Sequence, residues 1–87
     1  MSDDQIKQKI AQVQAMYGQE LMQKANVTGV GIGYKRIKGE STDQLALVVM
    51  VKEKVPIDDL APQDRIPSEI DGIPVDVQDV GGMFFAQ

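Results

Sequence analysis

Hydrophobic residues recur at spacings of three and four along the first quarter of the chain. They are Ile6, Ile10, Val13, Met16 or Tyr17, Leu21 and Ala25. This spacing places them on one face of an α-helix. Ser2, with Gln5 three residues later, forms a capping-box pattern, so we predict a helix over residues 3–24. Gly18 lies inside the run and is a poor helix former, which predicts a bend or a break there.

A period of two replaces this pattern in residues 27–35, VTGVGIGYK, and predicts a β-strand. One face carries Thr28, Val30, Ile32 and Tyr34, and the other carries Gly29, Gly31 and Gly33. A face without side chains allows another element, for instance a helix, to approach the backbone. Gly31→Val is then expected to cost about 1 to 3 kcal/mol by overpacking. The glycine spacing does not fit a phosphate-binding loop, so no nucleotide site is predicted.

Residues 45–51, LALVVMV, form a continuous apolar run that is typical of a strand covered on both faces. A polar turn over residues 38–43 would join it to the first strand as a hairpin. Residues 56–60 favour a short helical turn because proline suits the first helical position. Asp71-Gly72 predicts a second hairpin, and two prolines place at least one of its arms at a sheet edge.

Together these elements predict an α+β domain with a long N-terminal helix packed on a small sheet of three or four mostly antiparallel strands. The length of 87 residues allows one domain, assigned to residues 1–80. Residues 81–87 form an apolar C-terminal tail that contains Met83, Phe84 and Phe85. Two adjacent phenylalanines are difficult to bury in one small core, so we expect the tail to contact a second copy. The alternative is that one ring folds back on its own sheet.

Composition narrows the possible partners. Nine basic against thirteen acidic residues give a net charge of −4, which disfavours nucleic acid and anionic membranes. The acidic N-terminus does not resemble a signal peptide and no apolar stretch of 18 residues occurs, so a cytoplasmic location is expected.

Candidate chemistry is limited because the chain has no histidine and no cysteine. The hydroxyls of Thr28, Ser41, Thr42 and Ser68 therefore lack the usual activating base, and no enzymatic activity is expected. Acidic residues are frequent after Pro56, but they do not follow the spacing of a calcium loop. We predict neither a metal site nor a cofactor.

Several blocks in fixed order carry a family resemblance: residues 27–35, residues 42–49 (TDQLALVV), residues 54–56 (KVP), residues 65–67 (RIP) and residues 70–77 (IDGIPVDV). Residues 26–81 resemble the N-terminal segment of bacterial and plant trypsin-like serine proteases of the narrow-leaf type, a segment that is also found as a short stand-alone hypothetical protein. In that family a protease domain with the catalytic triad follows, and no triad residue has a counterpart here. The resemblance implies a non-catalytic module concerned with protease assembly, folding or partner contact.

The leading functional prediction is a non-enzymatic interaction or assembly module that forms homo-oligomers, with Met83, Phe84 and Phe85 as candidate contact residues. Exposed sheet edges favour it. The alternative is a pro-domain-like regulator that binds a trypsin-like serine protease through an edge strand or the tail. A small-ligand or metal-binding domain is a third possibility.

Overall fold

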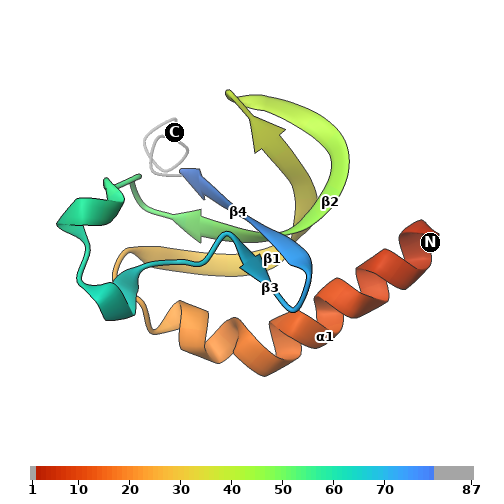
Figure 1. Cartoon of the computed structure of the whole chain (residues 1–87), viewed down its shortest axis with the longest axis horizontal. Coiled ribbons are helices and arrows are strands. Elements are labelled where there is room, and N and C mark those ends of the chain that lie inside the picture. The colour runs from red at the N-terminus through yellow and green to blue at the C-terminus, as the bar shows by residue number, and fades with distance from the viewer. Residues whose placement is uncertain (1, 80–87) are drawn as a thin grey trace, which may run out of the picture.

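A computed structural model describes residues 2–79, with Ile57 described by its backbone alone, and shows one helix packed on a four-stranded mixed sheet (Figure 1). The elements are α1 (Asp3–Met22), β1 (Val27–Ile37), β2 (Glu40–Val51), two short 3-10 turns (Ile57–Asp59 and Pro62–Asp64), β3 (Glu69–Ile70) and β4 (Ile73–Asp79). This confirms the predicted α+β class.

The helix begins where the sequence predicts. The Oγ atom of Ser2 accepts a hydrogen bond from the Gln5 amide over 3.3 Å, and Gln5 Oε1 accepts one from the Ser2 amide over 3.2 Å. Both bonds of the capping box are therefore present. The helix continues through Gly18 without a break and ends at Met22, two residues before the expected end. Of the bend or break expected at Gly18, the break does not occur, and Tyr17 and Leu21 pack on the core on either side of the glycine.

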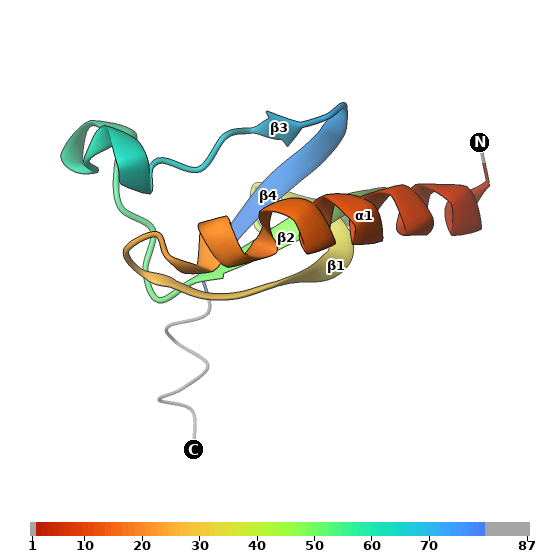
Figure 2. The same cartoon turned by 90° about the horizontal axis from the view of Figure 1, so that it is seen from below.

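One face of α1 supplies the helical half of the core. Ile10, Val13 and Leu21 are buried, and Tyr17 packs beside them. Met16 is 69% exposed, so Tyr17 and not Met16 belongs to the buried face. Figure 2 shows α1 lying across the sheet.

The strands run in the order β1-β2-β4-β3. β1 pairs antiparallel with β2, and β3 pairs antiparallel with β4. The central pair, β2 with β4, is parallel, with Leu47 opposite Val75 and Val51 opposite Asp79. A parallel pair needs a crossover connection, which the segment with the two 3-10 turns provides.

Two tight turns set the hairpins. Asp71 and Gly72 both have positive φ angles, of 52° and 81°, which confirms the predicted Asp-Gly hairpin. Lys38 and Gly39 also have positive φ angles, of 53° and 82°. The first hairpin therefore turns over these two residues, and the six-residue polar turn expected over residues 38–43 is wrong. Asp-Gly is a strong turn signal whereas Lys-Gly is not, because lysine rarely adopts the left-handed region.

Residues 45–51 of the central strand β2 are covered on both faces, as predicted, whereas its first five residues, in the hairpin, are mostly exposed. Toward α1 it presents Leu45, Leu47, Val49 and Val51, which join the core cluster. Ala46 and Val48 are also buried but lie on the face away from α1.

The glycines of β1 lie on that second face, because Gly29, Gly31 and Gly33 pair with Met50, Val48 and Ala46. The prediction that a helix approaches the glycine face is therefore wrong: α1 packs on the Val30 side. A Cβ atom on Gly33 would lie 3.1 Å from Val48 Cγ2, whereas one on Gly31 would meet nothing within 4 Å. The Cβ position of Gly31 is thus uncrowded, which does not support the overpacking expected for Gly31→Val.

The outer part of the β1–β2 hairpin curls over the face that α1 leaves uncovered (Figure 1). Asp76 Oδ2 on β4 accepts a hydrogen bond from the Arg36 amide over 2.9 Å. Gln78 Nε2 donates to the Tyr34 carbonyl over 3.3 Å and to Asp76 Oδ2 over 3.0 Å. These bonds hold the hairpin against β4 and explain how side chains on this face become buried without a second helix.

Candidate interaction surfaces

The candidate hydroxyls do not assemble into a catalytic group. Thr28 Oγ1 donates to the Met50 carbonyl over 3.3 Å, and Thr42 Oγ1 donates to the Lys35 carbonyl over 2.7 Å. Both bonds join β1 to β2, so these hydroxyls stabilise the hairpin. Ser41 and Ser68 are exposed.

Several acidic side chains after Pro56 bind main-chain amides. Asp64 Oδ1 accepts from the Ala25 amide over 3.0 Å, and Asp79 Oδ2 accepts from the Lys54 amide over 3.3 Å. Among the described residues, no group of three or more acidic side chains lies close enough together to hold a metal ion. The contacts seen for Asp64, Asp76 and Asp79 connect segments that are distant in sequence.

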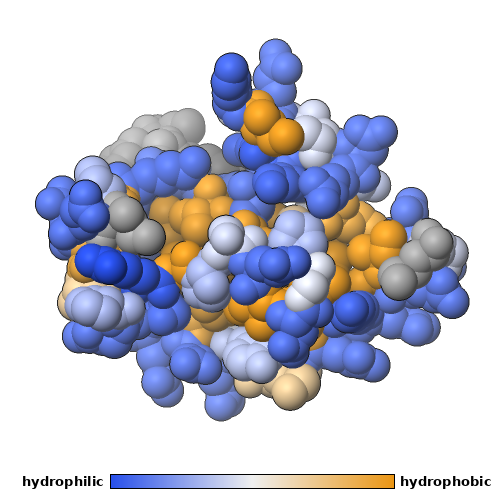
Figure 3. Space-filling view, viewed as in Figure 1, coloured by the Kyte–Doolittle hydropathy of each residue, from blue (hydrophilic) through white to orange (hydrophobic). Residues whose placement is uncertain are grey.

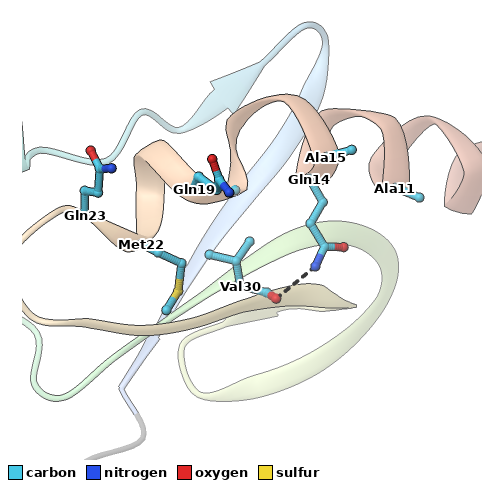
Figure 4. Close-up of a pocket in the computed structure, with 8 residues that line it drawn as sticks. Ala11, Gln14, Ala15, Gln19, Met22, Gln23 and Val30 are labelled. Atoms are coloured by element: carbon cyan, nitrogen blue, oxygen red, sulfur yellow. Dashed lines mark hydrogen bonds between the residues drawn. The ribbon is translucent and has the colours of Figure 1, made fainter.

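A groove of about 880 Å³ runs between α1 and the outer edge of β1. On the helix side it is lined by Ala11, Ala15, Gly18 and Met22, which recur at spacings of four, three and four and therefore share one face. Gln14 Nε2 crosses the groove and donates to the Val30 carbonyl over 3.1 Å (Figure 4). Figure 4 also shows the Met22 side chain directed toward β1.

Between its two register irregularities, the outer edge of β1 lacks the features that usually protect an edge strand. Lysine, proline, a bulge or a very short strand normally prevents pairing with another chain. Residues 27–34 contain no charged residue and no proline, and the register irregularities of β1 fall near the ends of this stretch, at Val27/Gly29 and Tyr34/Arg36. At the opposite edge β3 is only two residues long and follows Pro67, and it pairs with Ile73 and Pro74 alone, so the rest of β4 has no partner strand on that side within the described residues.

The open stretch of β1 centres on Ile32. Gln14 of α1 donates to the Val30 carbonyl, and Gln78 of β4 donates to the Tyr34 carbonyl. Every second residue in this part of β1 therefore turns its amide and carbonyl away from β2. Ile32 lies between Val30 and Tyr34, and its side chain is 41% exposed. Its amide and carbonyl are therefore placed to pair with a further strand.

A second, smaller cavity of about 220 Å³ lies at the seam between the end of α1, the end of β2 and the crossover segment. Its apolar walls come from four parts of the chain and comprise Ala25, Val51, Val55, Leu60, Ile66 and Val77. Glu53, Lys54, Asp64 and Asn26 also line it. In Figure 3 apolar residues gather in the middle of the face shown in Figure 1, and hydrophilic residues surround them.

The sequence-predicted contact residues Met83, Phe84 and Phe85 lie outside the described residues. The groove beside β1 was missed because its helix side consists of small residues and glutamines, which the helical pattern assigns to an ordinary solvated face. The absence of charge and proline across residues 27–34 was the available signal.

No protein-family model matches the chain, and no curated protein matches it. None of the helices within residues 2–79 combines the length and the apolar content that a membrane span requires. The α+β fold and the two surfaces described above are thus the basis for a functional proposal.

Proposed function

We propose that the chain is a non-enzymatic interaction module that self-associates through the outer edge of β1. The observation that carries this proposal is the contrast between the two sheet edges. β3 is too short to recruit a strand, whereas β1 offers an uncharged stretch flanked by a groove. Addition of a strand to an open edge is a common mode of protein recognition.

A two-fold axis beside Ile32 would pair β1 antiparallel with the β1 of a second copy. Most homo-oligomers are symmetric dimers in which the same patch contacts itself. Such pairing would continue the four-stranded sheet into a second copy and would bring both α1 helices to the same face. Ala11, Ala15 and Gly18 on the groove side would then allow the two helices to approach closely.

The resemblance of residues 26–81 to the N-terminal segment of trypsin-like proteases supports a non-catalytic role, because that segment precedes the catalytic domain. The absence of histidine and cysteine from the chain agrees with such a role.

Two isoleucines of β1 provide a matched test. Ile32 lies in the open stretch and Ile37 lies beyond the register irregularity at Tyr34/Arg36, and their side chains are 41% and 53% exposed. Ile32→Lys places like charges opposite each other across the proposed two-fold axis. Light scattering at micromolar concentration should show a dimer for the wild type and for Ile37→Lys, and a monomer for Ile32→Lys.

A monomeric wild type, or an equal effect of the two substitutions, would reject self-association through β1. A wild-type monomer that binds a trypsin-like serine protease, and loses this binding in Ile32→Lys, would support the alternative role as a pro-domain-like regulator. Circular dichroism of both variants checks that the fold is retained.

A further inference from the structure

The outer edge of β4 is open over its second half. The Val75 amide donates to the Ser68 carbonyl over 3.0 Å, so Val75 turns its amide away from β2. Because a strand alternates, Val77 turns its amide and carbonyl to the same side. The pairing of β3 with β4 ends at Pro74, and within the described residues no main-chain hydrogen bond reaches Val77 on that side. Val77 therefore offers one donor and one acceptor to a further strand.

The cavity at the seam lies directly beside this open edge. Val77 lines it together with Val55, Leu60 and Ile66, and all four side chains are half-buried. The cavity measures about 220 Å³. Since an aliphatic cavity of about 150 Å³ binds benzene, the seam cavity has room for one apolar side chain. Directly opposed residues of paired strands place their side chains on the same face, so a residue opposite Val77 would point toward the cavity.

Hydrogen bonds between distant segments frame this cavity. Asn26 is bonded through its side chain to both the amide and the carbonyl of Glu53. Asp64 Oδ1 accepts from the Ala25 amide over 3.0 Å. The end of α1, the end of β2 and the crossover segment are thereby tied together, so the cavity is formed before any occupant binds.

The segments that surround the cavity are acidic. Residues 53–79 contain eight acidic and two basic residues, whereas residues 1–52 contain five acidic and seven basic residues. Asp58 and Asp59 are exposed on the 3-10 turn that precedes Leu60, which lines the cavity. Charge complementarity therefore favours a cationic partner at this edge and disfavours a second copy of the same acidic segment.

We propose that the outer edge of β4 binds an extended, lysine- or arginine-rich segment of another protein as an added strand, with one apolar side chain of that segment in the seam cavity. In strand addition, main-chain hydrogen bonds supply affinity and pockets for alternate side chains supply specificity. Here Val77 supplies the main-chain groups and the seam cavity is the pocket. This binding uses a different edge from the proposed association through β1 and does not depend on it.

A short synthetic peptide in which lysine alternates with leucine is the probe. In an NMR titration it should slow hydrogen exchange at the Val77 amide and shift the methyl resonances of Leu60 and Ile66. Exchange at the Ile32 amide, on the edge of β1, should stay unchanged. The same peptide with glutamate in place of lysine should not bind. With serine in place of leucine, which keeps the charge and removes the apolar anchor, the Kd should rise at least about tenfold.

Two pairs of exposed acidic residues provide matched variants of the protein. Asp58→Asn with Asp59→Asn removes two negative charges beside the cavity, and Glu40→Gln with Asp43→Asn removes two from the β1–β2 hairpin. The first pair should raise the Kd of the lysine peptide about two- to tenfold, because exposed ion pairs make small individual contributions. The second pair should leave the Kd unchanged.

Three results would overturn the proposal. One is no binding of the lysine peptide, or equal binding of the lysine and glutamate peptides. Another is slowed exchange at Ile32 in place of Val77, which would assign the peptide to the edge of β1. The third is a Val77 amide that is already protected from exchange in the protein without peptide, which would show that the chain itself covers this edge.

Discussion

Gln14, in the middle of α1, donates a hydrogen bond from Nε2 to the main-chain carbonyl of Val30 on β1 over 3.1 Å. The bond satisfies one acceptor on the open edge of β1 and fixes the helix against that strand. In the proposed dimer the same carbonyl faces the incoming strand, so Gln14 competes with the second copy. This side chain consequently links the stability of the monomer to the exposure of the edge.

Gln14→Ala should lower the free energy of unfolding by about 0.5 to 1.5 kcal/mol, the usual net contribution of one hydrogen bond. It should leave dimerisation unchanged or strengthen it, because the competing donor is gone. Gln12→Ala is the control, since Gln12 is exposed on the same helix. Chemical denaturation and sedimentation measure the two effects, and a weaker dimer in Gln14→Ala would contradict the competition.

The glycines of β1 should respond unequally to alanine. At Gly33 the new Cβ would lie 3.1 Å from Cγ2 of Val48, a buried β-branched side chain with little freedom to move. Gly33→Ala should therefore destabilise the protein by about 1 kcal/mol. At Gly31 the space is open, so Gly31→Ala should be neutral or stabilising by up to about 1 kcal/mol. Equal stabilities of the two variants in urea would show that Val48 can move aside.

Leu47 on β2 is fully buried in the core cluster. Leu47→Ala should cost about 2 to 5 kcal/mol, through lost burial and the cavity that remains. This is a large part of the total stability of about 5 to 15 kcal/mol that is typical of small domains. Met16→Ala, at an exposed position on α1, should change stability by no more than about 0.5 kcal/mol. Thermal unfolding compares the two, and a similar loss in both would place Met16 in a contact.

Asp76 holds the curled end of the β1–β2 hairpin through the Arg36 amide. Asp76→Ala should accelerate hydrogen exchange at the Arg36 amide while exchange at Val49, in the centre of β2, stays slow. Asp43→Ala is the control because Asp43 is an exposed carboxylate on the same hairpin. NMR measures the exchange rates of both amides. Continued protection of the Arg36 amide in Asp76→Ala would show that the hairpin curls without the hydrogen bond to Asp76.

The purified protein should show no peptidase or esterase activity, because its hydroxyls have no activating base. The measurement is a broad substrate screen of fractions across the elution profile. An activity that co-elutes with the protein and is lost in Ser41→Ala or Ser68→Ala would refute the expectation.

Local interactions explain why several elements could be read from the sequence. Three of these features involve only residues within about four positions of one another. They are the spacing of apolar residues in the helix, the Ser2–Gln5 capping box and the Asp71-Gly72 turn. The unbroken apolar run of β2 required burial on both faces, whichever elements supplied it. The sequence by itself thus determined the α+β class, the helix start, the central strand and the second hairpin.

Tertiary structure decided the features that depend on contacts between segments distant in sequence. Three features depend on where the crossover segment returns the chain. They are the parallel pairing of β2 with β4, the burial of Tyr17 in place of Met16, and the hydrogen bond that joins the curled hairpin to Asp76. The alternation in β1 defines two faces without stating which one meets α1, and α1 covered the Val30 side while the glycines met β2 side chains. The unprotected β1 edge and the seam cavity arise in the same way, because burial and edge protection are properties of packed neighbours and not of sequence spacing.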